Sequence, residues 1–205
     1  TNRTTLQIIR NDSEHRWQSA ESIALLAAIA GLFHDFGKAG MCFQPTLKGE
    51  SQHLCQPYRH EWISVRLFEA FVGKQTDEQW LTSLTQLKAA DEKAMLKALK
   101  MDTDKNCSLL EKLPPLAKVV VWLMLSHHRL PQSHSTRPQL IYCEGWFEKQ
   151  LNADWNSLNH KSTEKHQWKE RDFKNVWKFP HGTPLKSKTW REKARQIGKR
   201  IRNLP

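Results

Sequence analysis

The sequence lacks features that define several common classes of protein. No apolar run approaches the roughly eighteen residues of a membrane-spanning helix, and the start of the chain has no signal-peptide layout. The 4 cysteines are scattered without a CxxC pair, which favours free thiols in a reducing compartment over disulfides. No long stretch alternates polar and apolar residues with a period of two, so no sheet is indicated. We therefore expect a soluble, cytoplasmic protein without strands.

Acidic residues are scarce at the end of the chain. Residues 160–205 hold 14 Lys and Arg against 4 Asp and Glu, so this segment carries +10 of the formal net charge of +11. Tryptophan and phenylalanine lie between the cations, a mixture typical of surfaces that bind phosphates and bases. A solvated tail with tryptophans docked into the core explains the composition equally well. The cations that we expect to contact nucleic acid are Lys161, Lys165, Lys169, Arg171, Lys174, Lys186, Lys188 and Arg191.

Apolar spacings predict helices through most of the chain. Residues 20–36 are apolar on most of the circumference of a helix, which predicts a buried central helix. Residues 58–72 place apolar side chains three and four apart, which predicts a strongly amphipathic helix. One or two surface helices are expected over residues 77–100, and a proline pair begins an apolar helix over residues 116–126. The fold class is therefore all-α, with one domain and a loop-rich basic C-terminal third.

Three of these expected helices carry histidine at one end. The residues concerned are His34 and Asp35, His60, and His127 with His128. Imidazole plus carboxylate is the ligand set for Zn, Mn, Fe, Co or Ni rather than for Mg or Ca. Adjacent side chains on a helix point about 100° apart, so neither adjacent pair easily reaches one ion. We therefore expect two divalent transition metal ions with the Asp35 carboxylate bridging them.

A pair of metal ions indicates a reaction class. Two ions roughly 3.5 to 4 Å apart can clamp the attacking and leaving oxygens of a phosphodiester. Lys38 lies three residues after Asp35, where its charge would neutralise a phosphate oxygen or the leaving group. We expect metal-assisted phosphoester hydrolysis with Asp35 and Lys38 as the catalytic residues. Each histidine alone is as well explained by a buried or capping imidazole, and only their joint occurrence indicates the metal site.

These motifs resemble a known superfamily. The order His34-Asp35, Gly37-Lys38, His60, His127-His128 resembles the HD phosphohydrolases. The longer stretches LFHDFGKAGMCFQ, YRHEWISVRLFEAFVG, LPPLA and SHHRLP, with TNRT and FPHGTPLKSKTWR near the ends, resemble the HD nuclease domain of the type I CRISPR nuclease-helicase, in particular its subtype F form. The resemblance covers nearly all of residues 1–205. It implies an HD-domain helical bundle around a dimetal site of Mn, Fe, Co or Ni.

The resemblance also implies an activity and partners. It implies a metal-dependent nuclease of antiviral defence that hydrolyses displaced single-stranded DNA after a crRNA-guided surveillance complex has opened the target. A helicase domain in the same polypeptide would feed the strand, an adaptation subunit would precede the nuclease, and a phage-encoded inhibitor is a further candidate partner. No membrane partner is expected.

Two departures from the family pattern bear on the site. The late aspartate of the family, in a segment that resembles LADH, does not occur before Pro205. The chain is therefore expected to be a fragment that lacks the last HD helix. The upstream histidine of many members has His15 as its only candidate here.

Two alternative functions remain open. An HD phosphohydrolase that acts on nucleotides or cyclic dinucleotides explains the metal site but not the basic segment. A module with an incomplete site would instead dock on the surveillance complex or an inhibitor. The nuclease predicts turnover of circular single-stranded DNA, the phosphohydrolase turnover of mononucleotides, and the docking module neither.

Overall fold

The described part of the chain is helical. A computed structural model describes residues 19–50, 57–102, 112–127 and 169–203. Its elements are α2 (Ser19–Phe33), η1 (Phe36–Ala39), α3 (Gln44–Leu47), α4 (His60–Val72), α5 (Asp77–Thr85), α6 (Asp91–Ala98), α7 (Pro115–Ser126), α9 (Glu170–Asn175), η4 (Pro184–Lys186) and α10 (Lys188–Arg202). No strand occurs within these four ranges. The all-α prediction is therefore confirmed.

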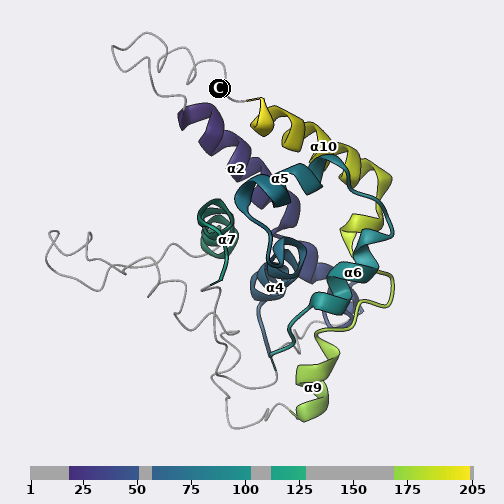
Figure 1. The fold of residues 1–205 in the computed structure, drawn as a ribbon. Helices are drawn as coiled ribbons and strands as arrows, with labels where there is room; N and C mark the ends of the chain where they lie inside the picture. Colours follow the sequence, from purple (N-terminus) through teal and green to yellow (C-terminus); the bar gives the residue numbers. More distant parts are fainter. Residues whose placement is uncertain (1–18, 51–56, 103–111, 128–168, 204–205) are drawn as a thin grey trace, which may run out of the picture.

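The central helix is α4 (Figure 1). It packs against α2, α6, α7 and η1, and 9 of its 13 residues are buried, including Glu61 and Arg66. The sequence predicts an amphipathic helix here and places the central helix at residues 20–36. That assignment is wrong, because α2 leaves Ile23 60% exposed while α4 is surrounded. Polar residues inside α4 conceal its burial from a reading of hydrophobic spacing.

The other predicted helices are confirmed with small shifts of their ends. Helix α2 stops at Phe33, three residues before the predicted end, and a short turn leads into η1. Helices α5 and α6 occupy the region of the predicted surface pair, and α7 matches the predicted apolar helix. Gly73 ends α4 with a φ of 58°, a conformation that glycine adopts without a steric penalty.

One stretch has the length and apolar composition of a membrane-spanning helix. It runs over Ala20–Ala39 and includes both α2 and η1. Ile29, Phe33 and Phe36 on this stretch are fully buried in the core. The apolar character therefore serves packing within the protein, and the stretch does not indicate a membrane protein.

Helix α10 lies in the basic segment, where the sequence analysis assigned no helix. Its N-cap is Ser187, whose hydroxyl accepts a 3.3 Å hydrogen bond from the backbone N–H of Trp190. Ala194 and Gly198 are the buried residues of this helix, which packs against α5. A Cβ at Gly198 would lie 3.0 Å from the Cβ of Leu84, so a small residue allows the close contact.

Trp190 attaches α10 to the end of α2. Its indole Nε1 donates a 2.9 Å hydrogen bond to the carbonyl oxygen of Leu32. Its ring lies 5.2 Å from that of Phe33 and 5.0 Å from that of Phe36, measured between centroids. These contacts place the start of the basic helix beside the His34–Asp35 turn.

A buried arginine links α4 to the chain that follows α6. Arg66 is 2% exposed, and its guanidinium donates hydrogen bonds of 3.0 and 2.7 Å to the two carboxylate oxygens of Asp102. Glu69 accepts a third hydrogen bond from Arg66, of 2.6 Å. Burial alone would lower the pKa of Arg66, but these carboxylates outweigh it and raise the pKa above its usual value. Arg66 therefore stays protonated inside the fold.

Candidate metal centre

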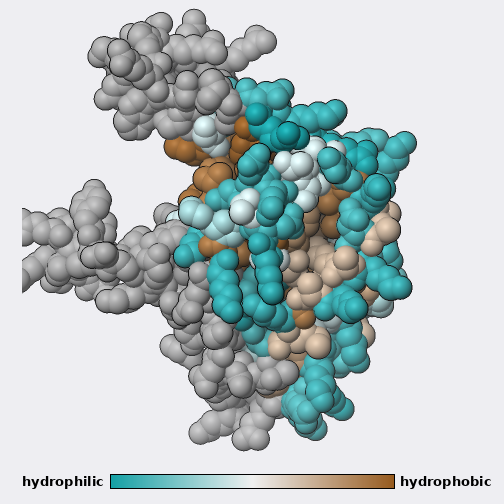
Figure 2. Space-filling model, in the orientation of Figure 1, coloured by the Kyte–Doolittle hydropathy of each residue, from teal (hydrophilic) through white to brown (hydrophobic). Residues whose placement is uncertain are grey.

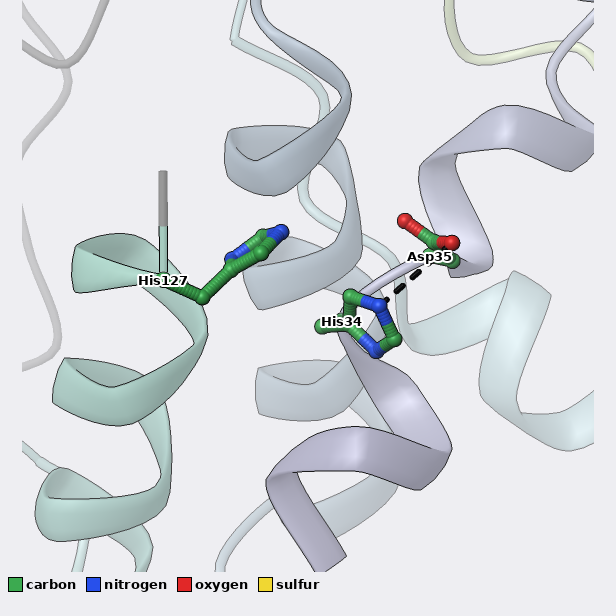
Figure 3. A group of neighbouring side chains, drawn as sticks. All are labelled: His34, Asp35 and His127. Carbon is green, nitrogen blue, oxygen red and sulfur yellow. Dashed lines mark ion pairs between the residues drawn. The ribbon is translucent and has the colours of Figure 1, made fainter. Parts of the chain in front are cut away.

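Three helix ends meet at one point. His34 and Asp35 occupy the turn between α2 and η1, His60 is the first residue of α4, and His127 follows α7 directly. The rings of His34 and His127 lie 4.8 Å apart between centroids, and those of His60 and His127 lie 6.3 Å apart. Figure 3 shows His127 reaching from the end of α7 toward the His34–Asp35 turn. The fifth predicted ligand, His128, lies outside the described residues.

The Asp35 carboxylate lies between two imidazoles. Its Oδ2 is 3.4 Å from Nε2 of His34, and its Oδ1 is 3.5 Å from Nε2 of His60. Lys38 donates a 2.9 Å hydrogen bond to Oδ2. Oδ1 is buried and accepts no hydrogen bond within the described part of the chain. A buried carboxylate oxygen in this state fits a metal ligand, because a bound cation would satisfy it.

Asp35 is ionised. Burial by itself raises the pKa of this carboxyl group, but the hydrogen bond from Lys38 and the charges of His34, Lys38 and His60 outweigh it. The pKa of Asp35 is therefore held below its usual range. The ionised carboxylate is the form that binds metal ions.

Two imidazoles of the cluster are oriented by backbone carbonyls. Nδ1 of His34 lies 2.8 Å from the carbonyl oxygen of Gly31, and Nδ1 of His127 lies 2.6 Å from that of Met124. A carbonyl oxygen only accepts hydrogen bonds, so in both rings Nδ1 carries the proton. In the neutral ring Nε2 then holds the lone pair, which is the form of histidine that binds a metal.

The structure corrects the spacing argument about adjacent ligands. Donor atoms of His34, Asp35 and His127 all lie within 4.8 Å of one another. Because α2 ends at Phe33, His34 and Asp35 lie in a turn, and the angle of about 100° between helix neighbours does not apply. This pair can therefore approach a single ion. The number of ions remains a prediction.

A second group of candidate ligands contains a residue that the sequence analysis missed. Donor atoms of His60, Glu61 and His127 also lie within 4.8 Å of one another. Glu61 is 3% exposed, and its Oε2 is 3.2 Å from Nδ1 of His60 and 3.3 Å from Nε of Arg59. Burial raises the pKa of Glu61, but the hydrogen bond from Arg59 outweighs it and the pKa lies below its usual range. Its place directly after His60, in PYRHEW, is the sequence feature that could have identified Glu61 as a candidate.

A close approach between η1 and α4 fixes the position of His60. The backbone N–H of Gly37 donates a 2.7 Å hydrogen bond to Oγ of Ser64, which itself donates a 2.9 Å bond to the carbonyl oxygen of His60. A Cβ built on Gly37 would lie 2.1 Å from that carbonyl oxygen. Only glycine fits here without moving the first turn of α4.

Several cations predicted to contact nucleic acid make contacts within the fold. Lys174 lies 2.6 Å from a carboxylate oxygen of Glu170, and Lys186 lies 3.5 Å from one of Glu92. Arg191 donates hydrogen bonds to the carbonyl oxygens of Leu185 and Lys186. Of the remaining predicted cations, Lys169, Arg171 and Lys188 lie within the described residues. Lys161 and Lys165 lie outside them. Arg191 therefore also has a structural role.

The fold and the cluster define a class of protein. An all-α bundle whose helix ends bring a His-Asp pair and two further histidines together is consistent with an HD-domain bundle.

Comparison with known proteins identifies particular relatives. The chain is 45% identical over 214 residues to the CRISPR-associated nuclease/helicase Cas3 subtype I-F/YPEST of Pectobacterium atrosepticum, a match that covers 100% of this chain and 19% of the relative. It is 38% identical over 200 residues to the protein of the same description from Pseudomonas aeruginosa, covering 95% of this chain and 18% of the relative. No family model matches the chain. The resemblance to the subtype I-F nuclease-helicase is confirmed, and the chain spans about a fifth of the length of these relatives.

Proposed function

We propose that residues 1–205 are the nuclease domain of a subtype I-F CRISPR nuclease/helicase and hydrolyse phosphodiester bonds of single-stranded DNA in a metal-dependent reaction in the cytoplasm. The observation that carries this proposal is the convergence of His34, Asp35, His60 and His127 from three helix ends, in a chain related over its whole length to proteins described as nuclease/helicases. The names of the relatives support a nuclease in a CRISPR context. The imidazole and carboxylate side chains support binding of a metal ion.

The residues of the cluster would have different roles in the reaction. His34, Asp35, His60 and His127 would hold the metal, and His128 is a further proposed ligand. When bound, two divalent ions of Mn, Fe, Co or Ni would supply Lewis acidity and lower the pKa of a bound water. Lys38 has a half-buried ammonium group beside Asp35, and a protein cation at this place can neutralise a phosphate oxygen of the substrate.

The basic segment would guide the strand. Lys188 is 85% exposed on α10, and Lys193 and Lys199 are also exposed on this helix. Figure 2 shows hydrophilic residues over most of the drawn face that carries α5, α6 and α10. Exposed cations on a protein surface attract a phosphate backbone and release counterions when it binds. We therefore extend the proposal to single-stranded DNA on this surface, with Lys161, Lys165, Lys169 and Arg171 as further contacts.

The names of the relatives support a fused helicase domain and a CRISPR context. We further propose a crRNA-guided surveillance complex and a phage-encoded inhibitor as partners. They concern the longer polypeptide, of which this chain would form one domain.

The test is cleavage of circular single-stranded DNA by the purified chain in Mn, Ni or Co, with EDTA as a control. Asp35→Ala should abolish nicking while the helical circular dichroism signal is retained, because the variant removes a charged ligand and little core volume. Glu78→Ala, at an exposed position of α5, is the matched control and should cut at the wild-type rate. Undiminished cleavage by Asp35→Ala would refute the proposed centre. Turnover of mononucleotides alone would support the phosphohydrolase, and inactivity on both substrates the docking module.

A further inference from the structure

The histidines of the centre differ in what orients them. His34 and His127 both follow the last turn of a helix, and each points Nδ1 at the carbonyl oxygen three residues earlier. The last carbonyls of a helix have no intrahelical partner, so they are available as acceptors. At these two positions the helix end itself fixes the ring.

His60 cannot use the same device. It is the first residue of α4, and the N-terminal turn of a helix presents N–H groups rather than unpaired carbonyls. The residue three positions earlier, Pro57, lies outside the helix. A carboxylate oxygen, Oε2 of Glu61, lies 3.2 Å from its Nδ1. Nε2 on the other side of the ring is 3.5 Å from Oδ1 of Asp35.

Glu61 is held in place by a second charged residue. Arg59 contacts both of its oxygens, Oε1 through Nη2 and Oε2 through Nε. The carboxylate is 3% exposed, so it has little freedom to turn away. Because both oxygens already face cationic or N–H groups, the contacts favour an orienting role over direct metal binding.

We infer that Glu61 is a positioning residue: it accepts the Nδ1 proton of His60 and thereby presents Nε2 to the metal centre, as backbone carbonyls do for His34 and His127. Carboxylates that accept the second ring N–H of a histidine ligand raise its basicity and fix its orientation. The inference rests on the proposed function in one respect, since it assumes that the centre binds a metal.

Two readouts test the inference on the full 205-residue chain. Long-range ¹H–¹⁵N NMR of the metal-free protein reports the ring tautomer, and the signals of His60 are assigned by their loss in His60→Asn. We expect His60 to carry its proton on Nδ1 in the wild type. Calorimetric titration with Mn²⁺ then compares affinities, and Glu61→Gln should bind about 10- to 100-fold more weakly.

Glu69→Gln is the matched control. It weakens a buried Arg–Glu pair on the same helix, with Arg66, without contacting His60. This variant should keep the wild-type Mn²⁺ affinity, so loss of a buried ion pair is separated from loss of the imidazole partner. Glutamine is nearly isosteric with the glutamate that it replaces in Glu61→Gln. The tautomer of His60 is measured on the wild-type protein, so that result does not depend on the folding of the variant.

The outcomes separate the two proposals. An Nδ1 of His60 that carries no proton, or equal Mn²⁺ affinity in Glu61→Gln and the wild type, would overturn the inference. Absence of Mn²⁺ binding by the wild type would overturn the proposed function instead. In that case the tautomer of His60 alone would show whether Glu61 orients the ring.

Discussion

The position of His60 depends on contacts at its ring and at its backbone. Glu61 faces Nδ1 of the ring, while Gly37 and Ser64 fix the backbone at the start of α4. The 3.5 Å separation between Nε2 of His60 and Oδ1 of Asp35 depends on both. The Gly-Lys dipeptide after the His-Asp pair therefore has two roles, since Gly37 permits the close approach and Lys38 neutralises Asp35.

Replacing Gly37 by alanine should disturb the centre. A Cβ placed 2.1 Å from the carbonyl oxygen of His60 must push α4 away, because its neighbour is backbone rather than a flexible side chain. We expect Gly37→Ala to lower the free energy of unfolding by about 1–3 kcal/mol and to weaken Mn²⁺ binding. Urea unfolding and calorimetric titration measure the two effects.

Gly31→Ala provides the control for this prediction. Gly31 lies in α2, and a Cβ there would have nothing within 4 Å. Alanine should therefore stabilise the helix by about 1 kcal/mol and leave the carbonyl that orients His34 in place. Unchanged Mn²⁺ binding and stability in Gly37→Ala would contradict the proposed function of the close approach.

The sequence identifies most residues of the centre but not their supports. His34, Asp35, His60 and His127 each stand at the end of an apolar helix, so helix packing brings them together. Glu61 follows His60 in the sequence, yet only the structure shows that its oxygens face inward. Ser64 gives no signal at all, because the hydrogen bond that it accepts from Gly37 joins residues 27 positions apart.

At the scale of elements, hydrophobic spacing in the sequence predicted where helices form better than it predicted which helices are buried. Helix α4 reads as amphipathic because Glu61, Ser64 and Arg66 interrupt its apolar face, and all three are buried with polar partners. Helix α10 was not predicted because its many cations obscure a helical spacing of packed residues. Those residues are Trp190, Ala194, Ile197 and Ile201.

The outer face of α10 should contribute to DNA binding. Lys188 and Lys193 are exposed on this helix, and Lys188 is only loosely paired with Glu192, at 3.9 Å. We expect the double variant Lys188→Gln/Lys193→Gln to bind single-stranded DNA more weakly. The slope of log K against log salt should fall by about 1.4, or about 0.7 for each lost phosphate contact.

The control for this prediction removes the same charge from another helix. Lys93 and Lys97 are exposed on α6, and Lys93→Gln/Lys97→Gln should keep the wild-type salt slope. Fluorescence anisotropy over a series of salt concentrations measures all three proteins. An unchanged slope in the α10 variant would assign this face to protein docking.

At the scale of the whole molecule, helix α10 of the basic segment packs on the same core as the His-Asp cluster. Trp190 joins α10 to the end of α2, and α10 also packs against α5. The cations of α10 are therefore attached to the helix whose end leads into the His34–Asp35 turn. We propose that this arrangement helps a chain with a net charge of +11 to bring a polyanion to the candidate metal centre.

The most direct test of the central claim is anomalous X-ray diffraction from crystals of the chain soaked in Mn²⁺. The account predicts a strong anomalous peak between Asp35 and the imidazoles of His34, His60 and His127, and its loss in Asp35→Ala. A second peak nearby would support the two-ion centre. Crystals that bind Mn²⁺ only elsewhere, or not at all, would contradict the claim that these helix ends form a metal centre.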